Sequence, residues 1–136
     1  MAETQAIPLG HHVRVCDRFQ MHLHEFGEPR DDRPSLLFLH GSGLGASGYS
    51  NFQHNMTYFA DRGWHVLVPD YLGYGLTDKP TDIAYTTAQQ IEAIVSLLSE
   101  KGVRSVVPIG NSLGGAIAIE LALTHPELVA KLIVMA

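Results

Sequence analysis

The chain has 136 residues, 46% of them hydrophobic and 17% charged, and its formal net charge is -5. This length suits one ordinary domain, and the composition is that of a globular protein and not of a disordered one. A net negative charge lacks the basic surface that is typical of nucleic-acid-binding proteins, so a nucleic-acid partner is not expected.

The N-terminal residues, the apolar runs and the cysteine count indicate where in the cell the protein is expected. Residues 1–5 are polar and acidic, without the basic stretch and long apolar core of a signal peptide. No apolar run approaches the ~18–20 residues that a bilayer span requires. The single cysteine, Cys16, excludes an internal disulfide and favours a reducing compartment. We therefore expect a cytoplasmic protein with no membrane partner.

The first predicted elements are two short strands within residues 11–25. In the second strand apolar and polar residues alternate, namely Phe19, Met21 and Leu23 against Gln20, His22 and His24. This alternation predicts an antiparallel hairpin with one solvent-facing side. His22 and His24 would share a face and could hold two positions of a metal site. No third or fourth ligand is evident, so a solvent-facing strand is the preferred interpretation and no metal is expected.

Beyond residue 34 the pattern changes to buried strands that alternate with helices. Ser35–Leu39 reads as a strand covered on both faces of a parallel sheet. Similar strands are predicted at 65–69, 105–109 and 131–135, and helices at 49–62, 87–101 and 112–124. This alternation indicates right-handed crossovers and a parallel sheet, which makes the fold class α/β. Only Pro108, which has no N–H for the ladder, disagrees with a regular central strand.

A glycine-rich loop follows the first buried strand, and four of its nine residues, 40–48, are glycine. Such a loop lets the backbone approach a ligand closely. His40 is interpreted as a hydrogen-bonded organiser of this loop and not as a base. Asp70 follows the next strand and is expected to hold the turn after it, beside the crevice where parallel sheets bind ligands.

The most informative motif is the Gly-x-Ser-x-Gly turn at residues 110–114, which lies between a predicted strand and a predicted helix. This is the context of a nucleophile elbow, which pushes a serine outward at a helix N-terminus. Gly110 and Gly114 suit a turn with no room for side chains beside that serine. Free N–H groups and the helix dipole favour negative charge there. Ser112 is therefore predicted to be a nucleophile, with oxyanion donors from the glycine loop and from Leu113.

These motifs resemble, in order and spacing, the α/β-hydrolase superfamily; they are His40-Gly41, residues 70–78 and residues 110–115. Within it, residues 41–47 with Asn51-Phe52, and again 110–115, resemble the meta-cleavage product hydrolases. Those enzymes hydrolyse C–C bonds in vinylogous diketones formed by aromatic ring cleavage. Leu44 and Leu113 depart from the proline and methionine usual in the family, but neither change removes a functional side chain.

The resemblance implies a set of site residues and no cofactor. Ser112 would be the nucleophile, and the oxyanion-hole N–H groups would come from Ser42 and Leu113. The substrate would be bound by Gly41, Gly43, Asn51 and Asn111, with the two asparagines at the polar dienoate end. Both asparagines are also suited to a cap or a turn, and that alternative stays open.

The family's catalytic order is Ser, then an acid, then His. His125 follows Ser112 but lies at the end of the predicted helix, about 18 Å away at ~1.5 Å per residue, so it cannot be the base. We expect residues 1–136 to be the truncated N-terminal part of one α/β-hydrolase domain. That part would contain a hairpin and parallel βαβ units and lack the lid and the C-terminal strands. The unpaired edge of strand 131–135 predicts that the chain alone aggregates or is poorly folded. Without the acid and the histidine of the triad, it is also expected to be inactive.

The expected function of the complete protein is serine-dependent hydrolysis of a small molecule, a C–C bond in a 2-hydroxy-6-oxo-dienoate. A carboxylesterase or lipase-like enzyme would use the same elbow and is the alternative within the fold. A ligand-binding receptor on a hydrolase scaffold is the alternative outside enzymology. Whether the complete protein is a homo-oligomer stays open.

Overall fold

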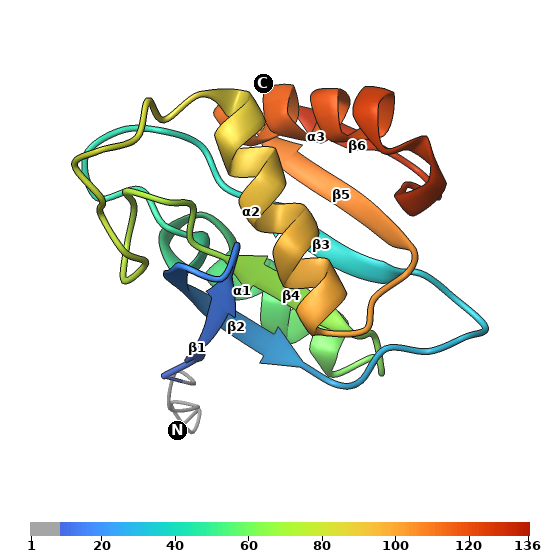
Figure 1. The fold of residues 1–136 in the computed structure, drawn as a ribbon. Helices are drawn as coiled ribbons and strands as arrows, with labels where there is room; N and C mark the ends of the chain where they lie inside the picture. Colours follow the sequence, from blue (N-terminus) through green and yellow to red (C-terminus); the bar gives the residue numbers. More distant parts are fainter. Residues whose placement is uncertain (1–8) are drawn as a thin grey trace, which may run out of the picture.

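The computed structural model describes residues 9–136, which form one six-stranded mixed sheet with helices on both faces (Figure 1). The strands lie in the order β1-β2-β4-β3-β5-β6. The elements are β1 (His11–Val15), β2 (Phe19–Phe26), β3 (Ser35–Leu39), α1 (Gly48–Ala60), β4 (Val66–Pro69), α2 (Thr87–Glu100), β5 (Val106–Asn111), α3 (Leu113–Thr124), a short 3-10 helix (Pro126–Leu128) and β6 (Ile133–Met135). The expectation for residues 1–5 lies outside the described residues.

The predicted order of strands and helices is confirmed. β1 and β2 form an antiparallel hairpin in which Val15 pairs with Phe19, and β2 continues antiparallel onto β4. β4, β3, β5 and β6 are joined by parallel pairings. The carboxyl ends of these four strands therefore meet at one edge of the sheet, from which the glycine loop, the Asp70 turn and the Ser112 turn all emerge.

Two hydrophobic clusters hold the layers together. α1 packs on one face, where Phe52 and Met56 meet Phe38 of β3. α2 and α3 cover the other face, where Ile94 and Ile117 belong to the larger cluster. Figure 1 views the sheet from the side of α2 and α3, with α1 behind it. Within residues 9–136, none of the helices combines the length and the apolar character that crossing a bilayer would need.

Pro108 lies in β5 without interrupting the strand, because it faces the segment leading into β6, where the hydrogen bonding between the two strands is irregular and no N–H of Pro108 is needed. The Val106 carbonyl accepts from Ala130 N–H at 2.9 Å, and Ser112 N–H donates to Met135 at 2.9 Å. The backbone groups of even-numbered residues in β5 therefore point toward β6, and the nitrogen of Pro108 points the same way. The pairing with β6 resumes only at Ile109. The proline thus stands where the neighbouring strand offers no regular partner.

The expectation of a solvent-facing side on the hairpin is wrong for β2. His22 and His24 are 3% and 5% exposed. β2 is an interior strand between β1 and β4, and Asp70 N–H donates to His22 carbonyl oxygen at 3.0 Å. The face bearing both histidines is covered by Tyr49 of α1 and by the Asp70 turn. Alternation alone could not reveal that cover, because it comes from segments far along the chain.

Candidate active site

Ser112 occupies a strained turn between the last residue of β5 and the first of α3. Its φ of 54° and ψ of -114° are disfavoured for an L-residue. A Cβ on Gly110 would come within 2.1 Å of Gly114 carbonyl oxygen, so the glycine that precedes the serine by two positions cannot carry a side chain. Ser112 itself is exposed and its side chain does not cap α3. These are the geometric features that the Gly-x-Ser-x-Gly motif predicts.

The glycine loop lies against this turn. Gly41 is buried, and a Cβ on it would stand 3.5 Å from Ser112 Cβ. Ser42, the next residue, is exposed. On the other side, Gly115 and Ala116 donate the first hydrogen bonds back to Ser112 carbonyl oxygen. The N–H of Leu113 precedes them and belongs to the unsatisfied donors of a helix N-terminus. The two N–H groups predicted to form an oxyanion hole thus belong to segments that flank Ser112.

His40 organises the start of the loop, as the sequence predicts. Its Nδ1–H donates to Gly41 carbonyl oxygen at 2.7 Å, and its Nε2 accepts from Tyr71 N–H at 3.2 Å. The ring is fully buried, and burial lowers its pKa below the usual value. Both nitrogens are therefore committed to backbone partners, and His40 is held as a neutral ring.

Asn51 and Asn111 meet beside Ser112 although they are sixty positions apart. Asn51 Oδ1 accepts from Asn111 Nδ2 at 3.0 Å and from Gly41 N–H at 3.0 Å. Three of the four residues expected to bind substrate, Gly41, Asn51 and Asn111, are thus in contact. Gly43, the fourth, lies in the exposed part of the loop, with nothing within 4 Å of its Cβ position.

Asp70 ties together the loops around this site. One carboxylate oxygen accepts from Gly48 N–H at 2.7 Å, and the other from Leu76 N–H at 3.1 Å and from His22 Nδ1 at 3.1 Å. The buried carboxylate is therefore the structural group that was predicted. His22 was missed: its Nε2 also contacts Leu9 carbonyl oxygen at 2.9 Å. The contact between His22 and Asp70 follows from the β2–β4 register, in which Leu23 pairs with Pro69. That register cannot be read from the sequence, so the sequence alone did not reveal the contact.

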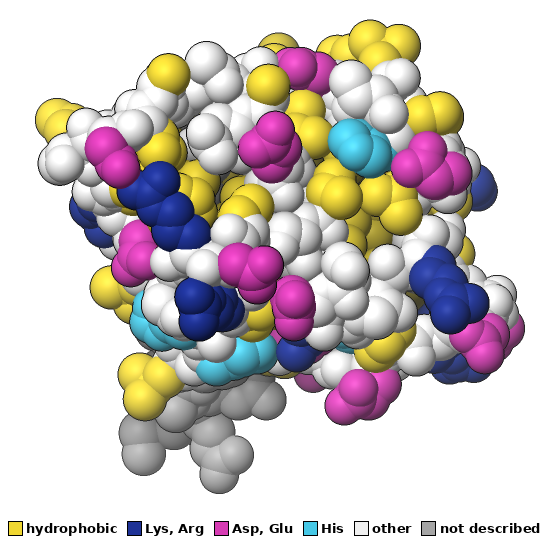
Figure 2. Space-filling view, in the orientation of Figure 1, with side chains coloured by type: hydrophobic (Ala, Val, Ile, Leu, Met, Phe, Trp, Pro, Cys, Tyr) yellow, Lys and Arg dark blue, Asp and Glu magenta, His cyan; other side chains and the backbone are white. Residues whose placement is uncertain are grey.

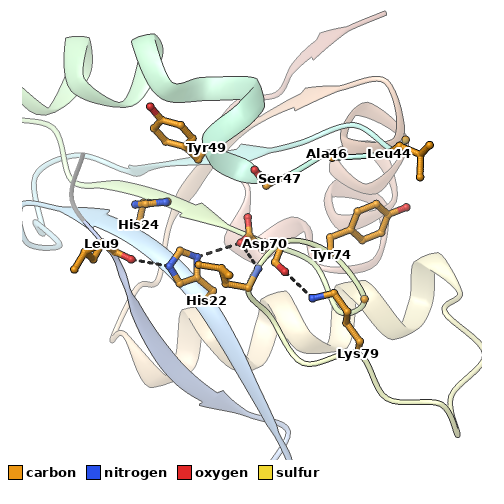
Figure 3. A pocket seen from close by; sticks show the side chains of 15 residues that line it. Leu9, His22, His24, Leu44, Ala46, Ser47, Tyr49, Asp70, Tyr74 and Lys79 are labelled. Atoms are coloured by element: carbon orange, nitrogen blue, oxygen red, sulfur yellow. Dashed lines mark hydrogen bonds and ion pairs between the residues drawn. The ribbon is translucent and has the colours of Figure 1, made fainter. Parts of the chain in front are cut away.

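A hollow of about 750 Å³ opens next to the loop (Figure 3). His22 and Asp70 form its floor, Tyr49 and Ser47 line it from the start of α1, and Leu44 and Tyr74 lie on its other side. Ser112 does not line it. A smaller hollow of about 320 Å³ is lined by Leu113, Ile117 and the segment from Gly73 to Gln90, and so touches the residue after the serine.

Two further expectations concern histidines. His125 lies at the C-cap of α3, at the opposite end of that helix from Ser112, as the rise per residue predicts. In residues 9–136, no group of three or more His, Cys, Asp or Glu side chains is arranged to hold a metal ion. His22 and His24 instead pack edge to face, with ring centroids 4.9 Å apart.

Known proteins resemble this chain over most of its length. Residues 34–136 match the family described as alpha/beta hydrolase fold. A 2-hydroxy-6-oxononadienedioate/2-hydroxy-6-oxononatrienedioate hydrolase of Pseudomonas sp. is 39% identical over 74% of this chain and 35% of its own length. A 2-hydroxymuconate semialdehyde hydrolase of Pseudomonas putida is 35% identical over 98% of this chain and 45% of its own length.

A solved structure agrees with these relatives. The meta-cleavage product hydrolase of Pseudomonas fluorescens IP01 superposes with a TM-score of 0.82 at 26% identity, over 90% of this chain and 43% of the other. The chain thus spans less than half the length of the relatives that it matches.

Proposed function

We propose that this chain, which belongs to the alpha/beta hydrolase family, carries the nucleophile and the oxyanion hole of a serine-dependent C–C bond hydrolase. The substrate class is a 2-hydroxy-6-oxo-dienoate from aromatic ring cleavage, as the names of the relatives suggest. Because the chain spans less than half of those relatives, the activity is proposed for the intact protein and not for residues 1–136 alone.

The observation that supports this most directly is the strained, exposed Ser112 with Gly41 against it. After the dienol becomes its keto tautomer, Ser112 attacks the ketone carbonyl or assists the addition of water there. The oxyanion then lies between the N–H groups of Ser42 and Leu113. Each such donor is worth roughly 3–4 kcal/mol of transition-state stabilisation. Water finally supplies the hydroxyl of the new carboxylic acid and the proton of the departing carbon.

The base for this reaction is proposed to come from outside the described residues. His40 has both nitrogens on backbone groups, and His125 lies at the far end of α3. His65 is hydrogen-bonded to Ser35 and Glu25, at the start of β3 and away from the elbow. No metal or cofactor enters the proposal. We further propose that residues 1–136 alone are inactive and that the intact protein is cytoplasmic.

Turnover of a coloured 2-hydroxy-6-oxo-dienoate by the intact protein tests this function, with a 4-nitrophenyl ester as the competing substrate. We expect loss of the dienoate colour with a kcat/KM well above that for the ester, and loss of both activities in Ser112→Ala. Faster ester turnover would favour the carboxylesterase alternative, which uses the same elbow. Stoichiometric binding without turnover would favour the receptor alternative.

A further inference from the structure

The Asn51 side chain joins the two segments from which the proposed oxyanion hole is built. Its Oδ1 accepts from the backbone N–H of Gly41, in the glycine loop, and from Nδ2 of Asn111, the residue before the serine. A backbone N–H can only donate, so the atom that faces Gly41 is the carbonyl oxygen of the amide. A carbonyl oxygen has two lone pairs, and both are used here inside the protein.

Gly41 is packed closely against the Ser112 turn, so in its present position its N–H depends on Asn51 Oδ1. It is buried, and its Cβ position lies 3.3 Å from Asn111 carbonyl oxygen and 3.5 Å from Ser112 Cβ. A buried N–H without an acceptor costs free energy, so the backbone would shift if Asn51 were removed. A shift of Gly41 would move the loop relative to the elbow.

The direction of Ser42 N–H depends on the same residue. Ser42 N–H and Gly41 carbonyl belong to one planar trans peptide and point in opposite directions. His40 fixes the carbonyl side of that peptide at 2.7 Å, and Asn51 fixes the N–H of the peptide before it. Gly41 is thus held from both sides, which aims Ser42 N–H at one place.

The helix around Asn51 directs its side chain to this contact. α1 begins with a capping box between Ser47 and Ser50, and Asn51 N–H donates to Ser47 carbonyl oxygen at 3.2 Å. The next residue, Phe52, departs from helical geometry with φ -126° and ψ 16°. The first turn of α1 is therefore set by its own cap and by the kink. The remaining polar group of Asn51, Nδ2, lies 3.3 Å from Ser50 Oγ.

We propose that Asn51 is a positioning residue, which holds the oxyanion-hole loop in register with the nucleophile elbow. The inference rests on the proposed function for the reaction that it affects. It predicts that Asn51 matters for every substrate whose reaction needs the oxyanion hole, including substrates with no carboxylate.

The test uses the intact protein with Asn51→Ala, and Asn55→Ala as the matched control, since Asn55 is exposed one turn further along α1. The substrates are a 2-hydroxy-6-oxo-dienoate and 4-nitrophenyl acetate. We expect Asn51→Ala to lower kcat for both by a similar factor, about ten- to hundredfold, because misplaced reacting groups cost that much. KM should change little, and Asn55→Ala should behave as the unchanged protein. A rise of KM for the dienoate alone, with ester turnover unchanged, would overturn the proposal.

A second readout does not depend on activity. Backbone hydrogen exchange of the Gly41 amide should be slow in the unchanged protein and in Asn51→Asp, which keeps an acceptor oxygen, and fast in Asn51→Ala. Equal exchange in Asn51→Ala and the unchanged protein would refute the positioning role. If the unchanged protein hydrolyses neither substrate, the proposed function fails, and exchange at Gly41 still decides this inference.

Discussion

Gly114 lies directly against Leu39: a Cβ on Gly114 would stand 1.9 Å from Leu39 carbonyl oxygen and 2.8 Å from that of His40. The first turn of α3 thus rests on the end of β3, where the glycine loop begins. This close approach brings Ser112 beside Gly41, although the two residues are far apart in the chain. The second glycine of the motif is therefore needed for packing between segments as much as for the turn itself.

Gly114→Ala should destabilise the protein strongly, because both nearby atoms are backbone and cannot rotate away. We expect the free energy of unfolding to fall by about 3 kcal/mol, at the upper end of the cost of overpacking. Urea denaturation measures this. Gly115→Ala is the matched control, since its Cβ would come closest to a side-chain atom, Val134 Cγ1 at 2.8 Å on an exposed strand, and would stay 3.5 Å from the nearest backbone oxygens. Equal losses in the two variants would contradict this explanation.

His40 should make stability depend on pH. Burial lowers its pKa in the folded protein below the usual value of a histidine, so the unfolded chain binds more protons at mildly acidic pH. The contribution to stability is present above about pH 6.5 and is lost as the pH falls below it. His40→Asn, which keeps a donor for Gly41, should flatten the dependence of the free energy of unfolding on pH between about 5 and 7.

The control for this measurement is His54→Asn, which changes an exposed histidine of α1. It should leave the slope of stability against pH as it is in the unchanged protein. If His40→Asn keeps the full slope, other groups are responsible for the dependence, and the buried His40 is not the sensor.

The apolar edge formed by β6 should make the 136-residue chain prone to aggregate when it is alone. Leu132, Ile133, Val134 and Met135 are each 40–48% exposed, and Leu123 of α3 is 76% exposed. Figure 2, seen from the side of α2 and α3, shows exposed hydrophobic side chains at several places on this face, including the region of α3. Light scattering of the isolated chain should rise with concentration, and Ile133→Lys should reduce it, since a charge on an edge strand opposes pairing. A cooperative thermal transition of a monomer in dilute solution would contradict the prediction.

The sequence predicted the strands and the elbow because each depends on a local pattern. The apolar segment at β3 and the glycines around Ser112 need no knowledge of distant neighbours. The burial of His22 could not be predicted in this way, because it depends on Asp70 and Leu9. The resemblance had placed Asn51 and Asn111 at one end of the site, but their direct contact could not be predicted from a local pattern, since it depends on how α1 packs on the sheet beside the end of β5.

The backbone strain at Ser112 should lower the free energy of unfolding of the protein. A non-glycine residue at φ 54° and ψ -114° holds backbone strain of about 1–3 kcal/mol. Ser112→Ala removes the hydroxyl and keeps the strain, so it should abolish turnover and leave the free energy of unfolding nearly unchanged. Ser112→Gly also removes the hydroxyl but adopts a positive φ freely. After the entropy that glycine adds to the unfolded chain, we expect a net gain of about 1 kcal/mol. Chemical denaturation of the two variants separates strain from chemistry, because both lack the nucleophile. If Ser112→Gly is no more stable than Ser112→Ala, the turn stores no strain that the serine must bear.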